Sequence, residues 1–232
     1  VVPEGAFRQG CNLAWDTECE IDESPYHEVN VSRFFIDKYE VTVDAYGKCV
    51  AEGACQALIG TSSICNHAIP GKGQHPMNCI TWFHAKDYCT WAGKRLCSES
   101  EWEKASRGTD GRIYPWGNEA ATCDYAVKHN GQSGCGTNST WPVGSKPAGA
   151  SPYGALDMSG NVWEWVEDDW HSTYTGAPTN GSAWVENPRA SARVVRGGGF
   201  ATYGWYLRSS FRFHEDPALA VRYFGARCCR AP

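Results

Sequence analysis

The chain contains few of the residues that build helical proteins. Among its 232 residues are six Leu and two Met, against 25 Gly, 11 Trp and 11 Tyr. Leu and Met are strong helix formers, whereas Gly favours turns and aromatic residues favour strands. A helical bundle is therefore excluded. The hydrophobic content of 42% and the charged content of 20% are ordinary for a globular protein and exclude general disorder.

Long basic runs and long apolar runs are both absent. No run of basic residues exceeds two and the formal net charge is −5, so the sequence offers no positive surface to nucleic acid. No apolar stretch approaches the roughly 18 residues of a transmembrane helix, which excludes a membrane span of that kind. Because Val1 is not followed by the charged and apolar regions of a signal peptide, we expect a mature, processed chain.

The twelve cysteines include no CxxC pair, which disfavours zinc or iron–sulfur sites and favours disulfides. A high, even count predicts complete pairing in an oxidising compartment, so we expect a secreted, cell-surface or periplasmic location. The spacing between neighbours predicts the pairs Cys11–Cys19, Cys49–Cys55, Cys65–Cys79 and Cys123–Cys135. Spacing alone leaves Cys89, Cys97, Cys228 and Cys229 unassigned. The alternative to a purely structural role for all twelve cysteines is a redox-active region at the adjacent Cys228 and Cys229.

Local patterns predict short elements separated by long loops. Capping residues and apolar periodicity predict three helices, and a glycine follows each of them. These helices begin after Thr42, Thr81 and Ser98 and end before Gly53, Gly93 and Gly108. Aromatic and β-branched runs predict strands over 162–166 and 193–195. The sequence therefore predicts an α+β fold with little regular secondary structure, formed as a single loop-rich domain over residues 1–232.

Several segments, in order along the chain, resemble the formylglycine-generating enzyme or sulfatase-modifying factor family. They are Asp37–Thr42, Trp91–Leu96 with Glu99–Glu103, Tyr114–Gly117, Asp157–Trp165, Arg196–Phe200 and Gly225–Arg227. The resemblance implies this family's variant of the C-type lectin fold, stapled by disulfides. It also implies a Cys89–Cys228 pair, which leaves Cys97 for Cys229.

The resemblance also identifies two positions whose side chains decide whether the chain can bind copper as the family's oxidases do. Family members that oxidise a substrate cysteine to formylglycine are similar in carrying two copper-binding cysteines, five residues apart, after the Arg-Gly-Gly segment. Aligning that segment on Arg196 places Thr202 and Leu207 at the two cysteine positions. Neither side chain supplies the soft thiolate that copper(I) prefers. We therefore expect no copper and no formylglycine-generating activity.

Calcium is the cofactor that the resemblance implies, in a structural role. The family's site corresponds to Asp157 by side chain and to Met158, Gly160 and Val162 by backbone carbonyls, an oxygen-rich set suited to a hard cation. A second site is partly represented by Asp124 and Tyr125. The alternative is an ordinary turn in which Asp157 caps a backbone N–H.

Histidines and acidic residues give weaker indications of a metal site or a ligand-binding cleft. The seven histidines form no HxH or HxxxH pair and assemble no metal site in sequence, although His171 and His214 flank segments that form the family's cleft. The acidic residues Glu164, Glu167, Asp168 and Asp169 lie beside tryptophans and are interpreted as solvated loop charges. A raised pKa or cation binding among the indoles is the alternative.

Two functions from different classes remain. The first is a secreted or periplasmic binding module whose cleft presents aromatic contacts to a peptide, protein or carbohydrate ligand. The residues of this predicted cleft are Thr202, Tyr203, Trp205, Tyr206, Trp163 and His214. The second is a metal-dependent oxidoreductase of the same family that acts on a peptide or peptide-derived substrate without the two-cysteine copper site.

Overall fold

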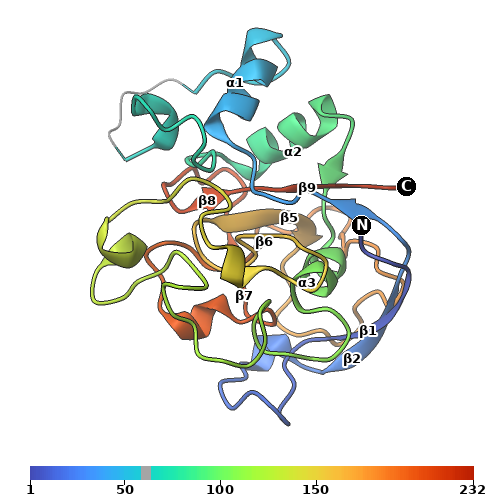
Figure 1. The fold of residues 1–232 in the computed structure, drawn as a ribbon. Helices are drawn as coiled ribbons and strands as arrows, with labels where there is room; N and C mark the ends of the chain where they lie inside the picture. The colour runs from blue at the N-terminus through green and yellow to red at the C-terminus, as the bar shows by residue number, and fades with distance from the viewer. Residues whose placement is uncertain (59–63) are drawn as a thin grey trace.

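The computed structural model describes residues 1–58 and 64–232. A hairpin-like pair joins β1 (Gly5–Gln9) to β2 (His27–Val31). A second sheet has the order β3-β9-β4, formed by Phe35–Ile36, Cys228–Arg230 and Arg95–Leu96. The third sheet has the order β7-β6-β5-β8, formed by Arg212–Glu215, Arg193–Arg196, Trp163–Asp169 and Phe224–Gly225. In this central sheet β8 runs parallel to β5 and the other pairs are antiparallel (Figure 1).

The three expected helices are present as α1 (Val43–Ala51), α2 (Trp82–Trp91) and α3 (Glu99–Arg107). The capping box predicted at the start of α3 forms, because Ser98 Oγ accepts the N–H of Glu101 and the Glu101 carboxylate accepts the N–H of Ser98. Gly53, Gly93 and Gly108 follow the helices with positive φ, a conformation that glycine adopts without steric cost.

The central sheet separates two apolar clusters, because successive side chains of β5 point to opposite faces. Trp163 and Trp165 pack with residues of α1 and α2 on one face. Val166 packs on the other face with Trp102 of α3 and with Phe7 of β1. Figure 1 shows α1 and α2 together above the sheet and β1 and β2 at the opposite end of the molecule. The architecture is thus α+β, as predicted.

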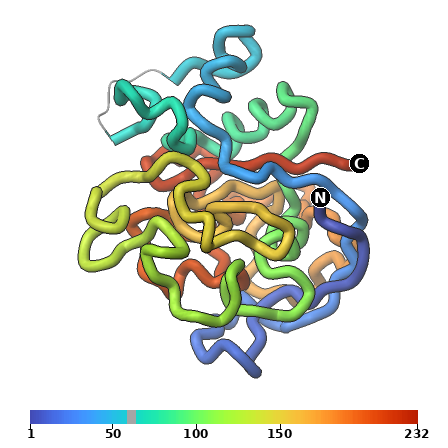
Figure 2. The backbone as a smooth tube through the Cα atoms, in the orientation of Figure 1, coloured from blue at the N-terminus to red at the C-terminus, as the bar shows by residue number. Residues whose placement is uncertain are grey.

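All twelve cysteines form disulfides, and the six pairs agree with those expected. The pairs are Cys11–Cys19, Cys49–Cys55, Cys65–Cys79, Cys89–Cys228, Cys97–Cys229 and Cys123–Cys135. Two of them close chain separations of 139 and 132 residues and fasten β9 to α2 and to the residue after β4. Since Val2 pairs with Phe34 just before β3, which pairs with β9, both termini lie on the same side of the fold (Figure 2).

None of the helices formed by the described residues is long and apolar enough to cross a membrane.

Candidate functional site

The loop after β6 holds Thr202 and Leu207, the two positions to which the family resemblance assigns copper-binding cysteines. Thr202 is engaged locally, since its hydroxyl donates to the carbonyl of Gly199 at 2.7 Å and accepts the Gly199 N–H at 2.9 Å. Leu207 is 0% exposed and packs in an apolar cluster with Tyr114. A Cβ on Gly198 would collide with this leucine, so the loop closes tightly over it. The two side chains therefore serve the packing of the loop.

This donor set does not fit copper. A hydroxyl that already caps its own loop and a buried isobutyl group replace the two thiolates. No cysteine elsewhere can substitute, because none is free. Within the described residues, the cluster of potential metal ligands is Cys11, Asp16 and Cys19, and its two sulfurs are bonded to each other.

Five rings contact one another in a chain, here called the aromatic band, which consists of Trp205, Tyr206, Phe211, Trp163 and Phe213, with Phe211 and Trp163 buried. Trp205 stacks on Tyr206 with 3.5 Å between ring centroids, and both contact Phe211 edge-on. Trp163 joins the two ends, with centroids 6.0 Å from Phe211 and 5.8 Å from Phe213. Trp205 is 38% exposed and Phe213 40%, so the band presents rings to solvent at both ends.

The predicted cleft residues are brought together in part. Trp163, Trp205 and Tyr206 all belong to the aromatic band. Tyr203 is 56% exposed and packs instead on His129, whose N–H donates to the carbonyl of Thr202. The ring of His214 lies 4.3 Å from that of Trp170 and 5.6 Å from that of Phe213, at one end of the band.

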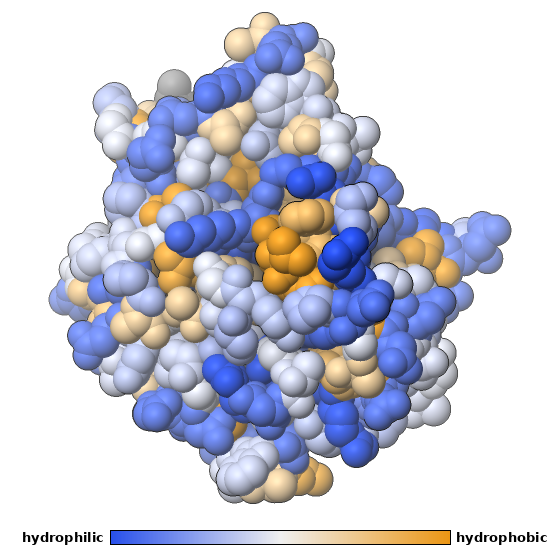
Figure 3. Space-filling model, turned by 45° about the vertical axis from the view of Figure 1, so that its right-hand side comes forward, coloured by the Kyte–Doolittle hydropathy of each residue, from blue (hydrophilic) through white to orange (hydrophobic). Residues whose placement is uncertain are grey.

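The surface is hollowed at places outside the aromatic band, and apolar residues reach the surface in several separate patches on the face that Figure 3 shows. One hollow of about 380 Å³ lies between β2, β4 and the loop of residues 180–183, and another of about 330 Å³ lies beside Trp15 and Trp116. The groove expected between Trp163 and Tyr203 stays a prediction.

The turn predicted to hold calcium is buried and strongly acidic. Asp157 has a φ of +58°, and its carboxylate accepts the N–H of Gly144 at 2.5 Å. Nearby Glu40 accepts the side-chain amide of Asn161 at 2.7 Å and the N–H of Val162 at 3.1 Å. Burial, followed by the negative charge of the Asp157 carboxylate, raises the pKa of Glu40.

One guanidinium partly balances these charges. Arg227 pairs with Glu164 at 2.6 Å, and both side chains are buried. Three buried carboxylates, those of Glu40, Asp157 and Glu164, therefore face one cation of the chain. Since an unbalanced buried charge is costly, this excess of negative charge fits a bound divalent cation. The Asp157 carboxylate itself caps the N–H of Gly144, the contact expected of an ordinary turn, so the calcium site stays a prediction.

The residues expected at the second calcium site lie differently. Asp124 is exposed, and its carboxylate accepts the hydroxyl of Thr122. The Tyr125 ring stacks on Trp116 with the planes 8° apart. Side-chain ligation by Asp124 would need a further acidic partner, which the sequence did not supply.

The interpretation of the acidic residues beside the tryptophans as solvated charges is wrong for three of them. Glu164, Asp168 and Asp169 are buried. Burial, with Glu99 as the next cause, raises the pKa of Asp168 to about 8. Asp169 contacts Arg189 at 2.9 Å and Arg193 at 2.7 Å. Their partners come from other segments, so the local sequence gave no sign of burial.

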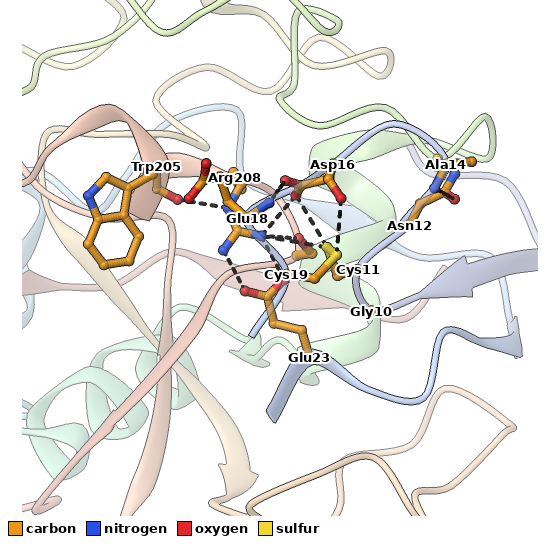
Figure 4. The surroundings of a disulfide bond; sticks show 12 residues. Gly10, Cys11, Asn12, Ala14, Asp16, Glu18, Cys19, Glu23, Trp205 and Arg208 are labelled. Carbon is orange, nitrogen blue, oxygen red and sulfur yellow. Dashed lines mark hydrogen bonds and ion pairs between the residues drawn. A yellow bond between two sulfur atoms is a disulfide. The ribbon is translucent and has the colours of Figure 1, made fainter. Parts of the chain in front are cut away.

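Sequence reasoning also missed a buried cation that joins the site loop to the N-terminal segment. Arg208 follows Leu207 directly, and its guanidinium binds both oxygens of Glu23, at 2.6 and 2.7 Å. It also contacts Asp16 at 2.9 Å, and its Nε donates to the carbonyl of Trp205 (Figure 4). The partners lie 185 and 192 residues away, so no short-range pattern points to them.

Comparisons with known proteins agree with this architecture. The family model described as the sulfatase-modifying factor enzyme 1-like domain matches residues 1–232. The chain is similar to the formylglycine-generating enzyme of Thermomonospora curvata, with 30% identity over all of this chain and 92% of that protein. It is also similar to the serine/threonine-protein kinase pkn1 of Chlamydia caviae, with 31% identity over 94% of this chain, but it spans only 36% of that protein's length.

Solved structures give the same result. The structure of PvdO from Pseudomonas aeruginosa superimposes with a TM-score of 0.86 and 30% identity, covering 99% of this chain and 92% of that one. The fold is therefore the formylglycine-generating-enzyme variant of the C-type lectin fold. The chain belongs to the sulfatase-modifying factor, or formylglycine-generating enzyme, family.

Proposed function

We propose that this chain is an extracytoplasmic binding module built on the formylglycine-generating-enzyme scaffold, with the copper-oxidase site lost. The carrying observation is the fully buried Leu207 at the position of the second copper-binding cysteine. Replacing a thiolate by a packed leucine removes a ligand and fills its space, so the loop is stabilised by packing without a metal. Six disulfides are compatible with an extracytoplasmic location.

The aromatic band is the proposed contact surface. Tyrosine and tryptophan offer large, rigid contact areas with few rotatable bonds, which suits recognition of a peptide, protein or carbohydrate. The ring of Trp205 packs against Tyr206 and Phe211, and more than a third of the side chain is exposed to solvent. Such a side chain loses little conformational freedom on binding.

Calcium has a structural role in this proposal. Asp157 would bind it through the carboxylate, and Met158, Gly160 and Val162 would bind it through backbone carbonyls. The ion would offset the buried carboxylates of Glu40 and Glu164, which otherwise share Arg227. This turn leads directly into β5, so the ion would stabilise the strand that carries Trp163.

The loss of oxidase chemistry is tested with the native protein loaded with copper(I) and incubated with a sulfatase-type cysteine peptide. We expect no aldehyde product by mass spectrometry, with the Thermomonospora curvata relative as the positive control. Copper-dependent conversion of the peptide would overturn this part of the proposal. Metal analysis of protein purified without chelator separates the classes further, because stoichiometric copper or iron would favour an oxidoreductase.

The contact surface is tested with Trp205→Ala against the matched control Phe83→Ala, which removes another exposed ring outside the band. Both variants are screened against peptide and glycan arrays. A ligand that contacts the band should lose about 1–2 kcal/mol of binding free energy with Trp205→Ala and keep its affinity with Phe83→Ala. Equal losses, or none in either variant, would contradict a role for the band.

A further inference from the structure

A second surface, separate from the aromatic band, has the composition of a sugar-binding site. It is the hollow of about 330 Å³ between the loop of residues 11–19 and the turn of residues 110–119. We infer that this hollow, here called the Trp15 hollow, binds a neutral saccharide. Trp15 supplies the stacking platform, and the polar side chains of the turn bind the hydroxyl groups. The inference does not depend on the proposed function of the aromatic band.

Trp15 is exposed although its loop is fixed. Its side chain is 59% exposed, yet the Cys11–Cys19 disulfide closes the loop around it. The N–H groups of Trp15 and Asp16 both donate to the carbonyl of Asn12. The Arg208 guanidinium binds the Asp16 carboxylate of this loop at 2.9 Å (Figure 4). These contacts fix the backbone that carries the exposed indole, so less of the loop remains to be ordered when a ligand binds.

The opposite wall is fixed by ring stacking. Trp116 stacks on Tyr114 and on Tyr125, with 4.9 Å between centroids in each pair and planes within 8° of parallel. Its indole N–H donates to the carbonyl of Glu119 at 3.0 Å. With its own N–H satisfied and its ring stacked, Trp116 acts as a fixed wall. The free aromatic face of the hollow is therefore that of Trp15.

The rim of the hollow offers both donors and acceptors. Asp110 and Arg112 form a fork, in which Nε and one terminal nitrogen of the guanidinium contact the carboxylate at 2.5 to 3.1 Å. Asn118 accepts the N–H of Ile113 through its oxygen, and its NH₂ group has no partner within the described part of the chain. The carboxylate of Glu119 likewise makes no hydrogen bond or ion pair to residues 1–58 or 64–232.

This combination favours a saccharide over other ligands. A pyranose ring has an apolar face of C–H groups, which the negative face of an indole attracts, and an edge of hydroxyls that both donate and accept. The rim supplies both partners for such hydroxyls. Two carboxylates against one guanidinium leave no positive excess to hold a phosphate or nucleic acid. The volume lies at the small end of the usual range for ligand sites, which suits one or two rings.

The saccharide site is tested with the oxidised protein on an array of short neutral oligosaccharides of hexoses and N-acetylhexosamines. The strongest binder is then titrated by calorimetry. Trp15→Ala should weaken binding about tenfold or more, and Trp15→Phe should restore part of the affinity because a ring is retained. Glu119→Gln should weaken binding less, since the amide keeps one acceptor. Near-ultraviolet circular dichroism checks that each variant keeps its fold.

Two matched controls separate this site from its alternatives. Leu13→Ala removes another exposed side chain from the same loop, and Trp205→Ala removes a ring of the aromatic band; both should leave the affinity within about twofold. The inference is overturned if no saccharide binds more tightly than about 10 mM or if Trp15→Ala binds like the native protein. It is also overturned if the Trp15 hollow captures a basic peptide from a parallel peptide array while rejecting every saccharide. A loss with Trp205→Ala alone would move saccharide binding to the band and leave the proposed function intact.

Discussion

Replacing Arg208 by methionine should destabilise the protein more than any surface substitution. The guanidinium is 1% exposed, and it is bound by Glu23 and Asp16, whose side chains are 0% and 5% exposed. Methionine keeps much of the side-chain volume but removes the charge. Both carboxylates then stay buried without their cation, which is the costly outcome when one partner of a buried ion pair is deleted.

The expected cost is about 3–5 kcal/mol of unfolding free energy at neutral pH. For a chain of this length each kcal/mol corresponds to roughly 2–4 °C in the melting temperature. Burial already raises the pKa of Glu23 above its ordinary value of 4.5, and Arg208 opposes that rise. Without Arg208 the pKa should rise further. A carboxyl whose folded pKa exceeds its unfolded pKa stabilises the fold at low pH, and that contribution disappears as the pH rises through the folded pKa.

Urea unfolding without reductant, followed by circular dichroism at about pH 5 and about pH 8, measures this effect. Arg208→Met should lose more stability at the higher pH. The double variant with Glu23→Gln should recover about 1 kcal/mol or more, because the buried charge is gone. Arg33→Met, at an exposed arginine, is the control. A cost below about 1 kcal/mol for Arg208→Met, or no coupling to Glu23→Gln, would refute the reasoning.

Three further outcomes are expected. Asp157→Ala should lower the melting temperature, and a calcium chelator should lower that of the native protein but not that of the variant; an unchanged native melting temperature would reduce the site to a capped turn. Burial, aided by the charge of Lys72, lowers the pKa of His75 to about 4. The stability that neutral His75 contributes should therefore decline as pH falls from about 6.5 to about 4, and a nuclear magnetic resonance titration midpoint near 6 would contradict this. Thiol titration of the denatured, unreduced protein should read near zero, and two or more thiols per chain would disprove complete pairing.

Local features of the fold were predictable from the sequence, because each depends on residues close together in the chain. The α3 capping box requires only Ser98 and Glu101, and helix ends at Gly53 and Gly93 require only a residue that tolerates positive φ. Short disulfide loops follow from spacing in the same way. The absence of copper-binding thiolates could also be predicted, since it needs only the identity of two side chains. The long disulfides came from family resemblance, as spacing left them open.

The tertiary structure decided which polar groups are buried and which aromatic groups are exposed. Glu164 and Asp168 look like loop charges in sequence, yet β5 carries them into the interior, where Arg227 and the start of α3 supply partners. Arg208 meets Glu23 across 185 residues. Trp15 is exposed on the Cys11–Cys19 loop, whose Asp16 is bound by that same arginine. The energy of these arrangements depends on partners far apart in the chain, and composition and periodicity carry no information about which distant segments will meet.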